Sequence, residues 1–258
     1  MSGADTRAAP SAVQRFFDAL LTRDAAGGSW LRPLLAATPY GPATLGELVE
    51  APGWLQSQLA VRGAEGRLGC FDYPTAPSPA LEAWFIDHPS ALTWPPGARM
   101  STDALRLRRA LIDDDPPGSQ ARAQERAHEL QSRRSALSRE WWRFEAVTRL
   151  DCVLITDRLA ITVQAPGGDR LEATTEWYPP RSQLHRGLEA ARRLADGKRF
   201  ASLVLSRTPL PGADAATLAR ELPAGAPHLD ELERRELADA YLGNLTWQAA
   251  AAAVGVEP

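Results

Sequence analysis

The sequence predicts a mixed α/β fold of the α+β kind, in which a central mixed sheet is flanked by helices and preceded by an N-terminal helical lobe. Residues 150–166 contain two apolar, β-branched runs around the dipeptide Asp157-Arg158, which is typical of a β-hairpin. A helix is predicted over residues 181–195 and a buried strand over 200–206 (FASLVLS). The order strand, strand, helix, strand indicates a sheet covered by at least one helix.

The N-terminal region, residues 1–117, is expected to be helical and to form a lobe of its own. Its first ten residues have the composition of a disordered segment. Pro89, Pro95 and Pro96 predict an extended or turning path between its later helices. The helices predicted here cover 13–21, 44–61 with a break at Pro52-Gly53, 80–87 and 104–112.

The central region, residues 118–207, is expected to form the sheet. A single long helix is predicted over 119–146, followed by the hairpin and a short strand over 171–177. Residues 208–258 form the third region. They are predicted to contain a Pro/Gly/Ala-rich linker over 208–227 and two helices between 229 and 256, divided at Gly243-Asn244.

Composition excludes several classes of protein. The formal net charge of -3 provides no overall positive field, so any contact with nucleic acid would need a local cluster of arginines. The chain has one lysine, Lys198, and therefore one candidate for any catalytic lysine. Two cysteines are too few for a disulfide scaffold. Because neither an apolar run of membrane-spanning length nor a signal peptide is visible, we expect no membrane contact and a cytoplasmic location.

The hairpin places two polar residues opposite each other. If Asp157-Arg158 is the turn, Thr156 faces Leu159, and the pairing then brings Asp151 opposite Gln164. Directly opposed residues lie on one face of the sheet, roughly 5 Å apart at their Cβ atoms. Pro166 would follow Gln164 on that face, because residues two apart in a strand point the same way.

Two segments around the hairpin resemble the PD-(D/E)XK nuclease superfamily, whose fold is that of many restriction endonucleases. They are 141–151 (WWRFEAVTRLD) and 175–189 (TEWYPPRSQLHRGLE). The resemblance covers residues 141–206 and, more loosely, 241–247 (YLGNLTW). It implies a restriction-endonuclease-like sheet. In the similar bacterial proteins, an aspartate is followed thirteen residues later by Glu-x-Lys-Arg. In this chain Gln164-Ala-Pro166 stands at that spacing from Asp151.

The resemblance also implies roles for individual residues. Asp151 matches the metal-ligand aspartate, and Glu145 matches a helix carboxylate that often joins the same site. Gln164 occupies the position of the second carboxylate, and Arg181 and Gln183 are expected to back the site or contact nucleic-acid phosphate. A structural role is the alternative for each: a turn or cap for Asp151, an ion pair with Arg149 for Glu145, and helix caps for Arg181 and Gln183.

Three functions follow from this pattern. Mg²⁺ would supply charge stabilisation and an activated water for phosphodiester hydrolysis, but it binds through carboxylates that Gln164 does not replace. The leading hypothesis is a nuclease-like protein with a degraded site that binds nucleic acid or a nucleoprotein partner; the resemblance to restriction endonucleases favours DNA as the nucleic acid. The alternatives are an active Mg²⁺-dependent endonuclease built on Glu145, Asp151 and one of Asp169 or Glu172, and a protein-interaction scaffold without nucleic-acid contact. A homodimer is compatible with each.

Overall fold

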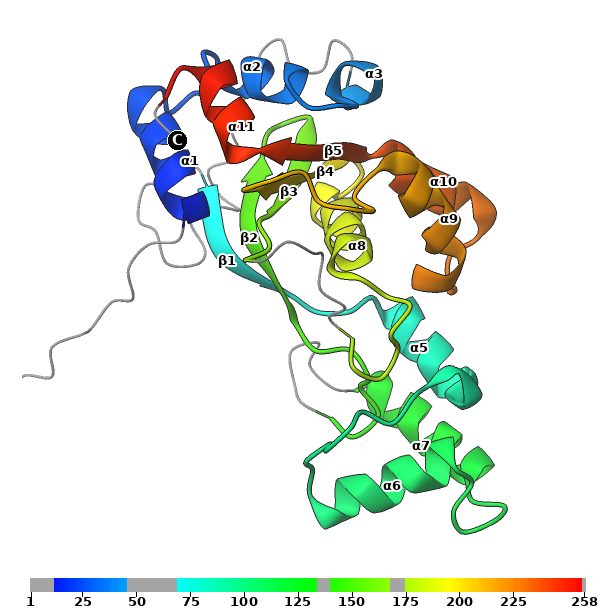
Figure 1. Ribbon diagram of the computed structural model, residues 1–258. Coiled ribbons are helices and arrows are strands. Elements are labelled where there is room, and N and C mark those ends of the chain that lie inside the picture. The colour runs from blue at the N-terminus through cyan, green and yellow to red at the C-terminus, as the bar shows by residue number, and fades with distance from the viewer. Residues whose placement is uncertain (1–11, 46–68, 134–139, 168–174, 257–258) are drawn as a thin grey trace, which may run out of the picture.

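A five-stranded mixed sheet forms the centre of the protein. The computed structural model describes residues 12–45, 69–133, 140–167 and 175–256. The strands lie in the order β1-β2-β3-β4-β5 (Figure 1). The pairs β1–β2 and β2–β3 are antiparallel, whereas the pairs β3–β4 and β4–β5 are parallel. The strands are β1 (Gly69–Thr75), β2 (Thr148–Ile155), β3 (Leu159–Gln164), β4 (Arg199–Ser206) and β5 (Tyr241–Thr246). The predicted mixed α/β class is therefore confirmed.

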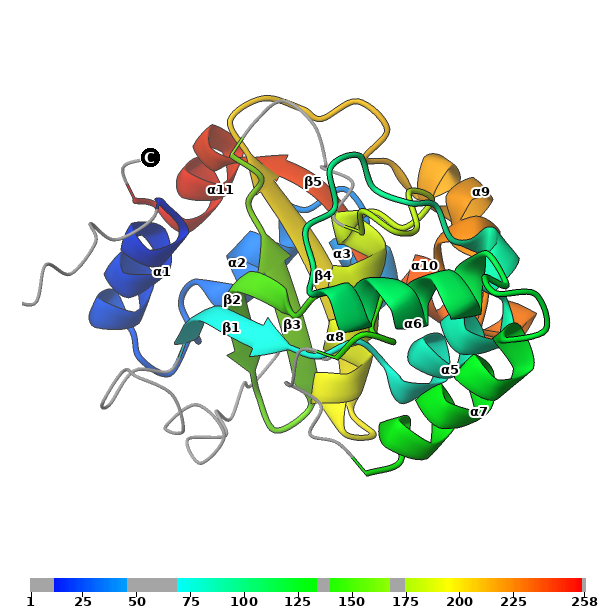
Figure 2. The same cartoon turned by 90° about the horizontal axis from the view of Figure 1, so that it is seen from below.

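Helices cover both faces of this sheet, as Figure 2 shows from below. On one face, Phe17 and Leu34 belong to the same buried cluster as Ile161 and Leu203 of the sheet. On the other face, Leu188 belongs to a cluster with strand residues. The helices of the first face are α1 (Ala12–Arg23), α2 (Leu31–Ala36) and α11 (Trp247–Val254). Helix α3 (Gly41–Leu45) lies beside β5. Helix α8 (Gln183–Ala195) covers the second face.

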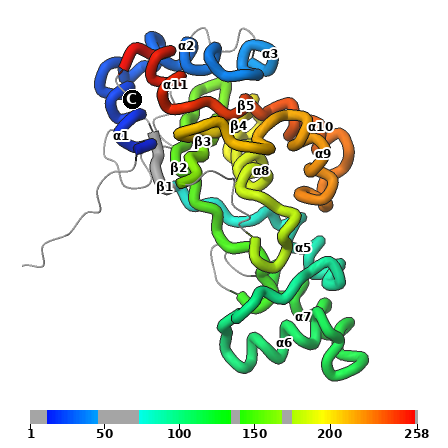
Figure 3. The backbone as a smooth tube through the Cα atoms, in the orientation of Figure 1, coloured from blue at the N-terminus to red at the C-terminus, as the bar shows by residue number. Residues whose placement is uncertain are grey.

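The two ends of the described chain meet on the first face (Figure 3). The rings of Phe16 and Trp247 lie 5.6 Å apart between their centroids. The guanidinium of Arg23 donates a hydrogen bond to the carbonyl of Val254 at 2.6 Å. Helix α1 and the C-terminal helix α11 thus close over the sheet together.

A second group of helices packs around its own core away from the sheet. Leu81 and Phe85 of this group are fully buried together with Leu111 and Phe144. The group comprises α5 (Pro79–Asp87), η2 (Pro89–Ala91), α6 (Thr102–Ile112) and α7 (Gln120–Gln131). The expected domain boundary at residue 117 falls between α6 and α7, which pack against each other. Two further helices, α9 (Ala215–Gly225) and α10 (Glu231–Asp239), connect β4 to β5.

The local predictions around the hairpin are confirmed. The backbone N–H of Thr156 donates to the carbonyl of Leu159 at 2.8 Å, which closes the turn at Asp157-Arg158. The helix predicted over 181–195 is present as α8, and the strand predicted over 200–206 is present as β4. Predicted helices over 13–21, 80–87 and 104–112 correspond to α1, α5 and α6. In the described part of the chain every helix is too short or too polar to cross a membrane.

The single helix predicted over 119–146 is wrong. Helix α7 ends at Gln131, residues 134–139 lie outside the described residues, and 140–147 has no regular structure. The reason is tertiary packing. Trp142 is fully buried in a cluster with Ile86 and Ala127, and Phe144 packs edge-on against Phe85 at 6.2 Å. Burial of two large side chains at alternate positions outweighs the helix propensity of their neighbours.

Three other predictions of secondary structure are also corrected. The linker predicted over 208–227 contains α9, whose N-cap Asp214 accepts a hydrogen bond from the N–H of Thr217. The break predicted at Gly243-Asn244 is the middle of β5. Most of the strand predicted over 171–177 lies outside the described residues, and the remainder, 175–177, is not a strand. The first ten residues and most of the predicted helix 44–61 also lie outside them.

Candidate functional site

Asp151 and Gln164 occupy paired positions at one edge of the sheet. The register pairs Cys152 with Val163, so the next position outward joins Asp151 to Gln164. Both residues are on the α8 side, because Thr162, which shares their face, donates a hydrogen bond to the carbonyl of Gly187 in α8 at 3.1 Å. Gln164 is the last residue of β3, so the pair lies at the carboxyl ends of the parallel strands, where α/β proteins commonly bind ligands.

The carboxylate of Asp151 is fixed by the hairpin itself. The backbone N–H of Ala165 donates to Oδ2 of Asp151 at 2.8 Å. Asp151 is half-buried. This placement agrees with the role of a metal-ligand aspartate. It agrees equally well with a structural role, in which the carboxylate caps the end of β3.

Gln164 is the most unusual residue of this edge. Its side chain is 1% exposed, and both its Nε2 and its Oε1 are buried without a hydrogen-bond partner among the described residues. It lies directly against α8, because a Cβ added to Gly187 would be 1.4 Å from Nε2. Glycine at position 187 is therefore required by the close approach of the amide. A buried, unpaired amide costs free energy, and such groups require an explanation.

Glu145 lies in the irregular segment before β2, not on a helix. Its carboxylate is buried and accepts hydrogen bonds from the Nε of Arg181 and from the hydroxyl of Thr175, the latter at 3.2 Å. Its Oε1 also lies 3.4 Å from the Nε of Arg186. Glu145 is therefore already neutralised by arginines. No hydrogen bond within the described residues joins it to Asp151.

Arg181 is the centre of a buried ionic cluster. It is 1% exposed, and its Nη1 donates to Oε1 of Glu189 at 2.8 Å and to the carbonyl of Gly225 at 2.9 Å. Burial alone would lower the pKa of Arg181, but the carboxylates of Glu145 and Glu189 raise it above its ordinary value. Arg181 thus joins the segment before β2 to α8 and to the end of α9. Gln183, the first residue of α8, is half-buried.

The same cluster connects the helical group α5–α7 to the sheet. Oε1 of Glu189 lies 3.4 Å from Nε2 of His228, and that nitrogen is 3.2 Å from the hydroxyl of Ser78, the N-cap of α5. Burial would raise the pKa of Glu189, but Arg181 and His228 hold it at about 2. The hydroxyl of Tyr178 donates to the carbonyl of Ala224 at 2.7 Å. These contacts fix the relative positions of the two parts.

A second buried pair lies on the helical side. The Nε of Arg143 is 3.0 Å from Oε1 of Glu82, and both side chains are more than nine-tenths buried. Burial raises the pKa of Glu82 to about 7, despite the opposing charge of Arg143. His185, in α8, accepts a hydrogen bond from the N–H of Ser182 through Nδ1, and burial followed by the charge of Arg181 lowers its pKa to about 4.

Sequence reasoning missed Arg186, Glu189 and His228 as members of this cluster. A signal was available for Glu189. It follows Leu188 and lies four residues after His185, which follows Leu184, so it adjoins the apolar positions of the helix. A carboxylate within an apolar helical stripe indicates a buried partner. Arg186 and His228 had no such signal; the two side chains beside His228, Ser78 and Glu189, are far from it in the sequence.

The described residues do not fit a Mg²⁺ site. Such a site would need carboxylate oxygens that are free to face the ion. Asp151 supplies one carboxylate, Gln164 supplies an enclosed neutral amide, and Glu145 is bound by arginines. The described ranges contain no group of three or more His, Cys, Asp or Glu side chains placed to hold a metal. Asp169 and Glu172, the other candidates, lie outside those ranges.

Comparison with known proteins gives no relative. No protein-family model, no curated protein and no solved structure matches this chain.

Proposed function

We propose that this protein is a PD-(D/E)XK-like nuclease homologue whose hydrolytic site is degraded, and that it binds nucleic acid without cutting it. The order of β2, β3, α8 and β4, a hairpin followed by a helix and a parallel strand, supports the proposal, because it is part of the element order that the resemblance implies; the third strand expected over 171–177 is not part of this support. So does the position of Asp151 opposite Gln164 at the carboxyl edge of the sheet. Family membership and nucleic-acid binding rest on the resemblance of the sequence segments.

The observation that carries the loss of hydrolysis is the burial of Gln164. Its amide is enclosed against Gly187 and brings no negative charge to the position where the family has a carboxylate. Pro166 stands where the family has a lysine, and its side chain has no hydrogen-bond donor or acceptor with which to replace that lysine. Asp151 would therefore have to hold a divalent cation without the second anion. We infer that hydrolysis is absent or very slow.

We expect exposed arginines at the same edge of the sheet to contact the nucleic acid. Arg181 is enclosed and cannot reach a surface phosphate while the cluster is intact. Arg149, two residues before Asp151 in β2, and Arg207, directly after β4, are both exposed and lie at this end of the strands. Arginines in such positions could contact phosphates, and each contact makes the affinity depend on salt.

The test is a binding measurement with labelled double-stranded DNA, single-stranded DNA and RNA across a range of salt. We expect affinity for at least one of them that falls with salt at a slope of about -0.9 for each phosphate contacted on duplex DNA. The double variant Arg149→Gln/Arg207→Gln should weaken binding and reduce this slope. The matched control, Arg106→Gln/Arg235→Gln, removes two exposed charges on α6 and α10 and should leave both unchanged.

Two results would contradict the proposal. Absence of binding at low salt for all three probes would favour the protein-interaction scaffold. Cleavage that requires Mg²⁺ and Asp151 would favour the active endonuclease.

A further inference from the structure

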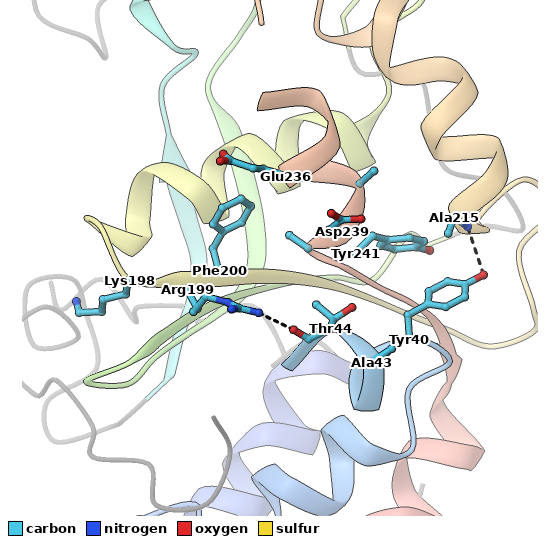
Figure 4. A pocket seen from close by; sticks show the side chains of 12 residues that line it. Tyr40, Ala43, Thr44, Lys198, Arg199, Phe200, Ala215, Glu236, Asp239 and Tyr241 are labelled. Carbon is cyan, nitrogen blue, oxygen red and sulfur yellow. Dashed lines mark hydrogen bonds between the residues drawn. The ribbon is translucent and has the colours of Figure 1, made fainter. Parts of the chain in front are cut away.

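An open pocket of about 790 Å³ lies at the other end of the parallel strands. It is formed where β4 and β5 begin, between the end of α10 and α3 (Figure 4). Asp151 and Gln164 lie at the opposite, carboxyl end, so this pocket is separate from the candidate site above. Its volume is within the range of about 300–1,000 Å³ that is usual for small-molecule sites. The lining side chains that matter below are Tyr40, Lys198, Arg199, Phe200, Asp239 and Tyr241.

The two tyrosine hydroxyl groups of the pocket already make hydrogen bonds. The hydroxyl of Tyr40 accepts a hydrogen bond from the N–H of Ala215 at 3.3 Å, as Figure 4 shows. The hydroxyl of Tyr241 donates to the carbonyl of Ala213 at 2.8 Å. Tyr40 and Phe200 are half-buried and offer apolar ring surface. The polarity of the pocket therefore resides mainly in its charged side chains.

Asp239 supplies the negative charge. It is the last residue of α10, where the helix dipole is negative, and the last turn of this helix contains no basic residue. A carboxylate at this position is disfavoured by the dipole. Within the described part of the chain Asp239 has neither a hydrogen-bond nor an ion-pair partner. Glu236, at the rim, is instead 3.6 Å from Arg192.

Arg199 supplies the positive charge from the first residue of β4. Its Nη2 donates to the carbonyl of Thr44 at 2.7 Å, which holds the guanidinium at the pocket wall and leaves further N–H donors unused. Lys198, the only lysine of the chain, is beside it. Neither cation is within ion-pair distance of Asp239. The pocket therefore carries an exposed guanidinium and an exposed carboxylate that do not pair with each other, and the rings of Tyr40 and Phe200 belong to the same lining.

We propose that this pocket binds a small zwitterion of the α-amino acid class. The ammonium group of the ligand would face Asp239 and the negative end of α10, and its carboxylate would face Arg199. An apolar side chain would lie against Phe200 and Tyr40. This arrangement satisfies both charges with one molecule, which neither a simple cation nor a simple anion does.

The test uses the full chain and isothermal titration calorimetry with a set of free L-amino acids, beginning with L-leucine. Two blocked derivatives remove one charge each: leucinamide lacks the carboxylate, and N-acetyl-leucine lacks the ammonium. We expect at least one free amino acid to bind, and its two blocked derivatives to bind at least about tenfold more weakly.

Variants then connect binding to the pocket. Asp239→Asn and Arg199→Gln should each weaken binding by at least about tenfold, because each variant removes one of the two charge pairs between the pocket and the ligand. The matched controls, Glu221→Gln and Arg220→Gln, make the same changes of charge on the exposed surface of α9 and should leave affinity unchanged.

Three outcomes would overturn the proposal. The first is no binding by any free amino acid up to about 10 mM. The second is binding of either blocked derivative as tight as that of the free amino acid, which would mean a site for a single charge. The third is binding that survives both pocket variants.

Discussion

Replacing Arg181 by methionine should destabilise the protein strongly without changing its surface. The guanidinium donates to both Glu145 and Glu189, and all three side chains are at least nine-tenths buried. Removal of one partner from a buried ion pair costs about 3–5 kcal/mol, because the remaining charge stays desolvated. Glu145 would keep Arg186 at 3.4 Å, and Glu189 would keep His228 at 3.4 Å. We therefore expect a loss of about 4 kcal/mol in the free energy of unfolding.

Urea unfolding followed by tryptophan fluorescence measures this loss. Arg235→Met is the matched control, because this arginine is 65% exposed in a surface pair on α10 and should change stability by less than about 1 kcal/mol. The triple variant Arg181→Met/Glu145→Gln/Glu189→Gln also removes the two carboxylates that lose their arginine partner. It should recover at least half of the lost free energy of unfolding, because neutral side chains leave no unpaired charge buried.

The reasoning would be refuted by a loss below about 1 kcal/mol in Arg181→Met, or by a triple variant as unstable as the single one. A variant that kept its stability and lost nucleic-acid binding would mean that Arg181 contacts phosphate after all.

Two further predictions concern the sheet face under α8. Gly187→Ala should lower the free energy of unfolding by about 1–2 kcal/mol, because the added Cβ would collide with Gln164. In the Gln164→Ala background the same change should be neutral or stabilising. Urea unfolding measures both effects, and a difference between them below about 0.5 kcal/mol would contradict the prediction. The pKa of His185 is lowered from 6.5 to about 4, so the folded state binds fewer protons and stability falls as the pH drops between these values. Urea unfolding of His185→Gln should show a gain of about 3 kcal/mol relative to wild type between pH 7 and pH 4, and a difference independent of pH would refute the assignment. Glu82 acts oppositely, since its pKa is raised from 4.5 to about 7, but it is common to both proteins and cancels in this difference.

Elements with a local signal were predictable from the sequence. The hairpin has a turn dipeptide between two apolar runs, and α8 begins after two prolines and ends at a glycine. The opposition of Asp151 and Gln164 followed from counting residues outward from the turn. This register is independent of the rest of the fold.

The two outer strands were not predictable in this way. β1 contains Pro74, which argues against a central strand but is tolerated at the edge of a sheet, where β1 lies. β5 contains Gly243, whose φ of +99° and close approach to Pro39 create a bulge that resembles a helix break in the sequence. In both cases the position in the sheet, which a local pattern does not contain, decides the conformation.

The candidate site was predictable only in part, for a similar reason. Glu145 was expected on a helix facing a metal, yet it lies in an irregular segment between two arginines. Its partners are 36 and 41 residues away in the sequence. Whether a carboxylate is free or neutralised depends on such distant partners, and no spacing rule within one segment gives them.

The most direct test of the central claim is a gel assay of supercoiled plasmid with the wild-type protein in Mg²⁺ and then in Mn²⁺, beside Asp151→Ala. One gel reports both retardation of the plasmid and its nicking. Our account predicts plasmid that is retarded in a salt-dependent manner and remains intact with both proteins and both ions, whether or not EDTA is added. Nicking by the wild type that EDTA or Asp151→Ala abolishes would contradict it and would mean that this edge of the sheet is a working nuclease site.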